Sequence, residues 1–151
     1  GDVMRGKQVF AASCATCHRV GTEGKAIGPD IGDSAMKPSA QLLTDVLDPN
    51  RAIDANFVSY TALTNDGLAH TGIISAETDG GVVLLTADGQ TVTVLRNDLE
   101  SLTGGKSLMP EGLEQQITVQ QMADLLAFLK PWRHADDWKP KGAVAANPPV
   151  R

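Results

Sequence analysis

The sequence predicts a mainly α-helical domain into which a small antiparallel β meander or barrel is inserted. Apolar residues recur at helical spacing near the start of the chain and again after Thr118, which indicates helices at both ends. From Phe57 the apolar period changes to two, and short turn sequences follow at regular intervals. A chain of 151 residues fits one such domain. We therefore predict a domain over residues 1–130, a β insertion over 56–97 and a C-terminal tail or linker over 131–151.

The first helix is predicted from about Val3, with Asp2 as its cap. Its apolar side carries Val3, Gly6, Val9 and Phe10. A glycine inside a helix costs about 1 kcal/mol relative to alanine. Gly6 therefore suggests that another backbone passes close to this helix.

The helix leads into Cys14-Ala15-Thr16-Cys17-His18, a spacing typical of covalent heme attachment. On one helical turn, residues three apart share a face, so both thiols can reach the vinyl groups along one porphyrin edge. His18 can then turn its ring towards the iron, and one axial position is left for another residue.

Other interpretations of the two cysteines are a zinc half-site, a redox dithiol and a pair of buried structural thiols. Zinc needs four ligands, but the chain has two cysteines, and His70 and His134 lie far from them in sequence. A dithiol exchanger normally follows a strand, and no strand pattern precedes Cys14.

The remaining elements follow in order. Residues 19–31 are glycine-rich and read as an irregular loop, and a second helix opens at 38–41 and ends at Asp48-Pro49. Strands are predicted at 57–64, 71–76, 81–86 and 91–96. Helical signals return at 98–100, a glycine-rich loop covers 104–110, and the last helix opens with a capping box at Thr118 and stops at Pro131.

Met109 is the favoured second axial ligand, because Pro110 follows it and glycines precede it in a loop that could hold a thioether over a heme. Met36 is a competitor in a loop. Met122 fits core filling, and Met4 lies too close before the cysteines. We expect His70 and His134 to be solvent-exposed.

The net charge of −5 argues against nucleic acid as a partner. No apolar run approaches the roughly 20 residues of a membrane span. Covalent heme attachment takes place outside the bacterial cytoplasm, so we expect a periplasmic or otherwise extracytoplasmic protein, of which this chain is a mature or excised segment.

Residues 14–18, which we call the pentad, together with Ser107-Leu108-Met109-Pro110 before the last helix, resemble the corresponding motifs of class I c-type cytochromes. The phrases at 28–31, 42–43, 48–49, 65–67, 72–74, 107–113 and 124–129 are similar to the heme-binding domain common in planctomycetes and verrucomicrobia. The resemblance spans about 3–129 and implies a cytochrome c-like, mainly α fold around one heme c and its iron.

The resemblance also implies the roles of single residues. Cys14 and Cys17 would form the thioethers, and His18 and Met109 would ligate the iron. The Pro29 carbonyl would orient the His18 ring. Gly6 and Phe10 would pack against the last helix near Phe128.

We therefore expect an electron carrier rather than an enzyme. Its partners would be an electron-donor dehydrogenase domain or protein and a downstream acceptor, and a homodimer is possible. One alternative is a small-ligand sensor or weak peroxidase in which Met109 dissociates from the iron. Another is a dimerisation or interaction module built on the β insertion.

Overall fold

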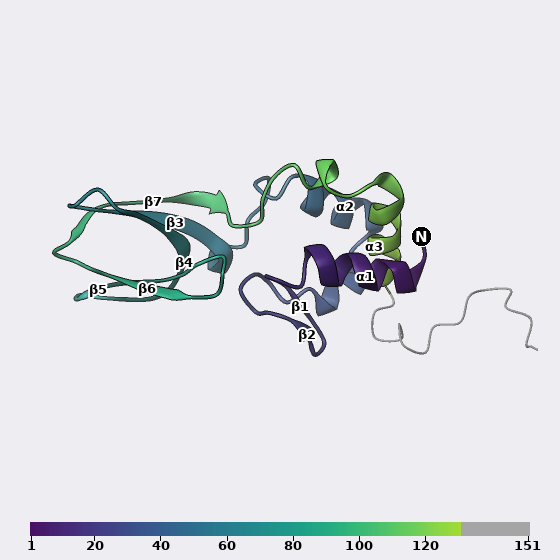
Figure 1. Cartoon of the computed structure of the whole chain (residues 1–151), viewed down its shortest axis with the longest axis horizontal. Coiled ribbons are helices and arrows are strands. Elements are labelled where there is room, and N and C mark those ends of the chain that lie inside the picture. Colours follow the sequence, from purple (N-terminus) through teal and green to yellow (C-terminus); the bar gives the residue numbers. More distant parts are fainter. Residues whose placement is uncertain (131–151) are drawn as a thin grey trace, which may run out of the picture.

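The computed structural model describes residues 1–130, with helices gathered at one end and a curled sheet at the other (Figure 1). The predicted tail over 131–151, with Pro131 and His134, lies outside the described residues. The helices are α1 (Val3–Ser13), α2 (Ser39–Leu47) and α3 (Val119–Leu129), with short 3-10 helices η1 (Gly32–Met36), η2 (Ala55–Phe57) and η3 (Leu113–Gln115). The strands are β1 (Arg19–Val20), β2 (Glu23–Gly24), β3 (Val58–Thr64), β4 (Ala69–Thr78), β5 (Gly81–Leu85), β6 (Thr91–Leu95) and β7 (Leu99–Ser107).

Helices α1 and α3 form the centre of the helical part. The predicted cap is confirmed, because the Asp2 side chain accepts a hydrogen bond from the Arg5 backbone N–H. A Cβ at Gly6 would lie 1.9 Å from the backbone oxygen of Asp124, so only glycine lets the two helices approach this closely. The rings of Phe10 and Phe128 meet at a centroid distance of 5.6 Å. The packing that the resemblance implied is therefore present.

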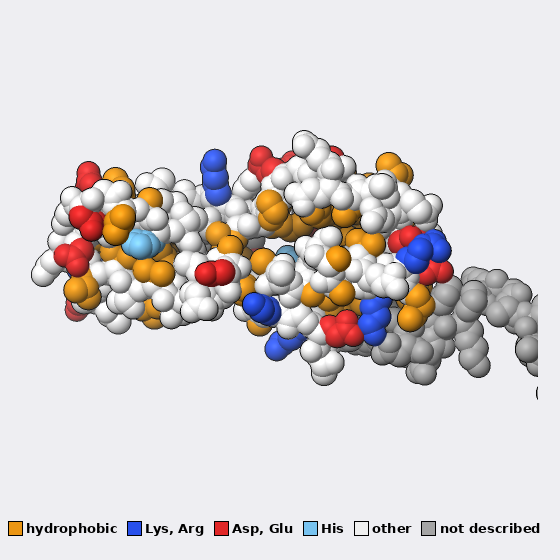
Figure 2. Space-filling view, in the orientation of Figure 1, with side chains coloured by type: hydrophobic (Ala, Val, Ile, Leu, Met, Phe, Trp, Pro, Cys, Tyr) orange, Lys and Arg blue, Asp and Glu red, His pale blue; other side chains and the backbone are white. Residues whose placement is uncertain are grey.

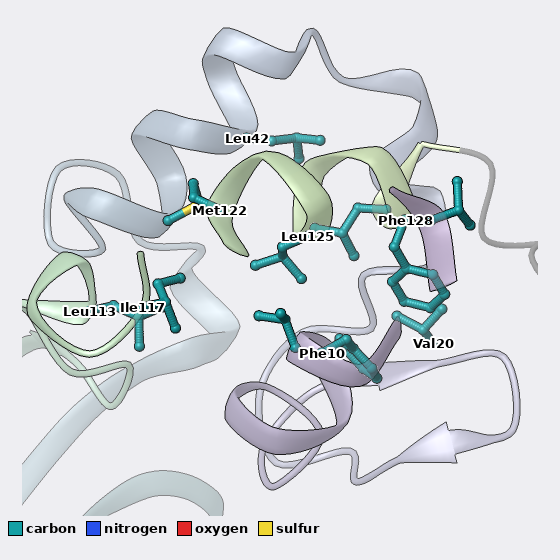
Figure 3. Close-up of a cluster of buried hydrophobic side chains, with 11 residues drawn as sticks. Phe10, Val20, Leu42, Leu113, Ile117, Met122, Leu125 and Phe128 are labelled. Atoms are coloured by element: carbon teal, nitrogen blue, oxygen red, sulfur yellow. The ribbon is translucent and has the colours of Figure 1, made fainter. Parts of the chain in front are cut away.

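A cluster of buried apolar side chains fills the space between these helices and the segments around them (Figure 3). We call it the helical core; its members are Val3, Val9, Phe10, Val20, Leu42, Leu113, Ile117, Met122, Leu125, Phe128 and Leu129. Leu42 is the buried residue of α2, whereas Leu47 is exposed, so the apolar side of α2 is only partly core.

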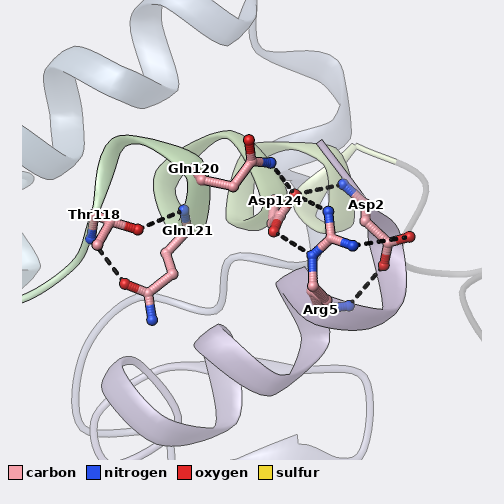
Figure 4. A network of polar contacts seen from close by, with 6 residues as sticks. All are labelled: Asp2, Arg5, Thr118, Gln120, Gln121 and Asp124. Atoms are coloured by element: carbon pink, nitrogen blue, oxygen red, sulfur yellow. Dashed lines mark hydrogen bonds and ion pairs between the residues drawn. The ribbon is translucent and has the colours of Figure 1, made fainter.

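A buried carboxylate ties α3 to the start of the chain (Figure 4). The Asp124 side chain, 2% exposed, accepts hydrogen bonds from the Asp2 backbone N–H at 2.6 Å and the Arg5 Nε at 2.8 Å. Gln120 Nε2 donates to it at 2.9 Å. The Arg5 hydrogen bond is the main reason that the pKa of Asp124 lies below its usual range, despite the opposing effect of burial. The carboxylate therefore stays charged inside the fold with its partners in place.

The larger sheet has the strand order β6-β5-β4-β3-β7, and every neighbouring pair is antiparallel. Its own core, which we call the sheet core, consists of Ala62, Val82, Leu84 and Val94, with Tyr60, Ile74, Val92, Leu99 and Leu102 packed against them. Side chains from both edge strands thus meet in one cluster, because the sheet is curled (Figure 1). The predicted antiparallel meander is confirmed.

Strand β7 corrects the sequence prediction at two points. Residues 98–100 are not helical, and Leu99–Ser107 pairs with β3, so the sheet continues past the boundary at 97. The glycines that suggested a loop belong to this strand. Gly105, at φ +119°, is the extra residue of a bulge opposite Ser59 and Tyr60, and a Cβ at Gly104 would collide with the Tyr60 ring. Cross-strand pairing therefore overrides the glycine signal.

The sheet touches the helical part through the turn between β5 and β6. A Cβ at Gly89 would lie 3.3 Å from Cδ1 of Ile27, which is itself buried. In the same turn, the pKa of Asp88 lies below its ordinary value because the Thr86 hydroxyl donates to it, and the charge of Lys25 adds to the effect.

Among residues 1–130, no helix has the length and apolar character to cross a membrane.

Candidate heme site

The pentad forms a tight turn directly after α1 rather than part of the helix. Helix α1 ends at Ser13, and the amide groups of Cys17 and His18 both donate to the Cys14 carbonyl, at 3.1 and 2.9 Å. Helix α1 therefore ends before the pentad, whereas the sequence predicted that it runs into it; the predicted single turn that joins the two cysteines is present. The backbone hydrogen bonds nevertheless fix the two thiols and the imidazole relative to one another.

Both thiols are unpaired and half-buried. Burial, together with a smaller contribution from the neighbouring Cys17, raises the pKa of Cys14 to about 11. Reactive dithiols have a lowered thiol pKa, so Cys14 does not fit that class. In the described part of the chain, no group of three or more His, Cys, Asp or Glu side chains is placed to hold a metal ion, as a closed zinc site would need.

The His18 ring is held in one orientation. Its Nδ1 lies 2.8 Å from the Pro29 carbonyl oxygen. A carbonyl can only accept, so Nδ1 carries a proton, and in the neutral ring the lone pair is therefore on Nε2. A Cβ at Gly28 would lie 2.9 Å from the ring, so this glycine lets the loop pack against the imidazole. The arrangement leaves Nε2 as the atom that can bind iron.

The segment between His18 and Pro29 is fastened to the pentad by backbone hydrogen bonds. The amides of Ile27 and Gly28 donate to the Cys17 carbonyl at 3.0 and 2.8 Å, and Lys25 donates to Ala15 at 3.0 Å. Strands β1 and β2 form a short hairpin where the sequence predicted an irregular loop. These backbone hydrogen bonds hold the loop so that the Pro29 carbonyl lies next to the His18 imidazole.

Met109 lies in the short connection between β7 and η3. Its side chain is half-buried and packs against the helical core, as Cys14 does. Its backbone N–H donates to Ser107 Oγ at 3.1 Å. The structure thus places Met109 and the pentad around the same cluster of buried side chains.

The competing residues lie in different surroundings. Met36 is 87% exposed in η1, where the sequence predicted a loop, and Met4 is 46% exposed. Met122 is buried in the helical core, as predicted. His70 lies in β4 and is half-buried rather than exposed. His134 lies in the tail, outside the residues that the structure describes.

The residues around the pentad fit a heme. Figure 2 shows a hollow in the helical part, with hydrophobic side chains along its margin and a histidine side chain at its edge. Partly buried apolar residues, among them Ile31, Leu43 and Leu126, also adjoin the helical core. Unpaired thiols are the groups that attach a covalent heme, and an imidazole nitrogen and a thioether are groups that can ligate its iron.

Residues 3–72 match the family model described as Cytochrome c. The matched segment includes α1, the pentad, Pro29 and α2, and it ends before Met109. No curated protein matches the chain. The match supports a c-type cytochrome with heme-based electron transfer, and a cytochrome c domain implies covalently bound heme c with its iron.

Sequence reasoning missed three residues that organise this part of the molecule: Arg5, Asn50 and Asp124. Arg5 and Asp124 form the buried pair between the helices. The Asn50 side chain bonds to the segment that carries Met109. A charged residue on the apolar side of α3 was a usable signal for Asp124, because buried carboxylates need partners. Nothing in the sequence pattern pointed to Asn50.

Proposed function

We propose that the domain transfers single electrons through one heme c that is attached by Cys14 and Cys17 and ligated by His18 and Met109. The observation that carries the proposal is the hydrogen bond between His18 Nδ1 and the Pro29 carbonyl, which orients the ring and leaves Nε2 as the nitrogen available to iron. Support comes from the half-buried Met109, which packs against the same core as Cys14.

When bound, the heme supplies a one-electron ferric–ferrous couple. The protein orients the axial ligands and excludes water from the heme. Pro29 fixes the imidazole, and a carbonyl partner raises the basicity of the ligating nitrogen. The thioether of Met109 favours the ferrous state, and apolar side chains of the helical core keep water from the site.

We propose further that the domain serves an exported dehydrogenase and passes electrons to a downstream acceptor outside the cytoplasm. The planctomycete and verrucomicrobial type, with its inserted β module, is supported by the motifs at 28–31 and 107–113 and by a sheet built from one continuous segment. We include a homodimer in the same proposal without assigning its interface, and a dimerisation or interaction module built on the sheet is the alternative to it.

The test is a redox titration of the matured holoprotein, combined with exposure of the ferrous form to carbon monoxide. We expect one heme per chain, a one-electron transition and no carbon monoxide spectrum, because Met109 closes the sixth position. Carbon monoxide binding to most of the ferrous protein would contradict the carrier and favour a sensor or weak peroxidase with a labile methionine.

A further inference from the structure

We propose that Asn50 is a positioning residue that holds both ends of residues 107–111, which we call the Met109 segment. By holding them it keeps the thioether of Met109 on the iron. The inference rests on the proposed function, since it concerns the ligand that closes the sixth coordination position. Asn50 follows the C-terminal end of α2 and is half-buried.

The side-chain amide of Asn50 contacts one residue on each side of Met109. Its Oδ1 accepts a hydrogen bond from the Ser107 backbone N–H at 2.9 Å. Its Nδ2 donates to Glu111 Oε1. Ser107 and Glu111 each lie two positions from Met109, so one side chain bridges the whole connection that presents the thioether.

The chemistry of the two partners requires an amide at position 50. A backbone N–H can only donate, and a carboxylate can only accept, so the bridging group must offer one acceptor and one donor. An aspartate would still accept from Ser107 but would place its charge against Glu111. An alanine would bond to neither group.

Two further hydrogen bonds, which do not involve Asn50, hold the start of the Met109 segment. Ser59 Oγ in β3 donates to the Lys106 carbonyl at 2.9 Å, and Ser107 Oγ accepts from the Met109 N–H at 3.1 Å. Strand β7 therefore anchors the start of the segment to the sheet. Asn50 adds the connection to α2, and so couples the Met109 segment to the helical part.

Loss of this bridge should let Met109 leave the iron more often, because a short surface connection held by fewer hydrogen bonds opens at lower cost. An added ligand competes with Met109 for the sixth position, so its apparent affinity reports the fraction of time that the methionine is away.

The experiment measures imidazole binding to the ferric holoprotein in four variants and the wild type. Asn50→Ala should tighten apparent imidazole binding by about tenfold, since 1.4 kcal/mol corresponds to a factor of ten. Asn50→Asp should tighten it at least as much, because two carboxylates then face each other. Adding Glu111→Gln to Asn50→Asp should restore wild-type affinity, because the glutamine amide can donate to the new carboxylate.

Asn65→Ala is the matched control. Asn65 Nδ2 donates to the Asn97 carbonyl within the sheet, so its loss removes a comparable bond far from Met109 in the chain. We expect wild-type imidazole affinity for this variant. Equal affinities for Asn50→Ala and Asn65→Ala would overturn the proposal, as would a double variant that behaves like Asn50→Asp alone.

The proposed function itself is read from the wild type in the same series. If the wild type shows the red absorption band of methionine-bound ferric heme, methionine ligation stands whatever these variants do, and the Met109→Ala and Met36→Ala variants identify the sulfur. If it lacks the band and the variants match it, both the ligation and the role of Asn50 fail.

Discussion

The helical part and the sheet differ in how the chain builds them. The sheet is one continuous segment, 58–107, with a core of its own, in which Val82 and Leu84 are fully buried. The helical part joins segments from both ends of the chain, and its core leaves Cys14 and Met109 half-buried at the margin. The residues proposed for heme attachment and ligation therefore adjoin the helical core, and the sheet core supplies none of them.

The ends of the sheet segment also explain why it leaves the helical part intact. Val58 and Ser107 are paired in the register of β3 and β7, so the chain enters and leaves the sheet at adjacent points. A segment with adjacent ends can be long without separating the elements on either side of it.

The largest difference between the two parts should come from their histidines. His18→Ala should bring covalent heme content close to zero, because the imidazole held by Pro29 is then missing. His70→Ala in β4 should leave heme content at the wild-type level. The measurement is heme per chain after maturation. Equal heme content in the two variants would remove the functional division between the parts.

The methionines give the next comparison. Met109→Ala should open the sixth position and lower the reduction potential by on the order of 0.1 V, a fraction of the roughly 0.8 V that axial ligands span. Met36→Ala should leave both spectrum and potential unchanged, because this side chain is exposed. Potentiometry and absorption spectra of the two variants check this. The reverse pattern would mean that Met36, and not Met109, ligates the iron.

Truncation in each core tests whether the two parts are separate. Phe10→Ala should cost about 3–5 kcal/mol and weaken the heme spectrum, since Phe10 lies in the helical core. Leu84→Ala should cost about 2–5 kcal/mol but leave the spectrum of the folded protein unchanged. Denaturation followed by heme absorbance and by far-ultraviolet circular dichroism measures both. A spectral change in Leu84→Ala that matches that of Phe10→Ala would mean that the cores act as one.

The smallest effect concerns acid stability. The folded pKa of Asp124 lies below its unfolded value of about 3.9, so its contribution is complete above about pH 4 and is lost as the pH falls through the folded value. Asp124→Asn should therefore lower the melting temperature at neutral pH and flatten its decline in acid. Asp66, an exposed residue of the sheet whose pKa the Thr64 hydroxyl lowers, is the comparison. Asp66→Asn should change the acid profile less.

Periodicity and turn sequences predicted α1, α3 and β3–β6 because each is a local pattern, although burial along β3 and β4 does not alternate strictly. Gly6 was informative, since a glycine in a helix implies a close neighbour, and Asp124 is that neighbour. Strand β7 was missed because Gly104 and Gly105 suggest a loop, and only the cross-strand partners Ser59 and Tyr60 make them a bulged strand.

The candidate site divides in the same way. The pentad is a local motif that any reading of the sequence can find. The contact between Pro29 and His18 was anticipated through the family resemblance. The bridge from Asn50 to Ser107 and Glu111 joins residues far apart in the chain and depends on tertiary placement. No local pattern specifies such a contact.

The most direct test of the central claim is the absorption spectrum of the ferric holoprotein. The account predicts a low-spin spectrum with the weak red band of methionine-bound iron, present in the wild type and in Met36→Ala and absent in Met109→Ala. A high-spin wild-type spectrum without that band would contradict ligation by His18 and Met109.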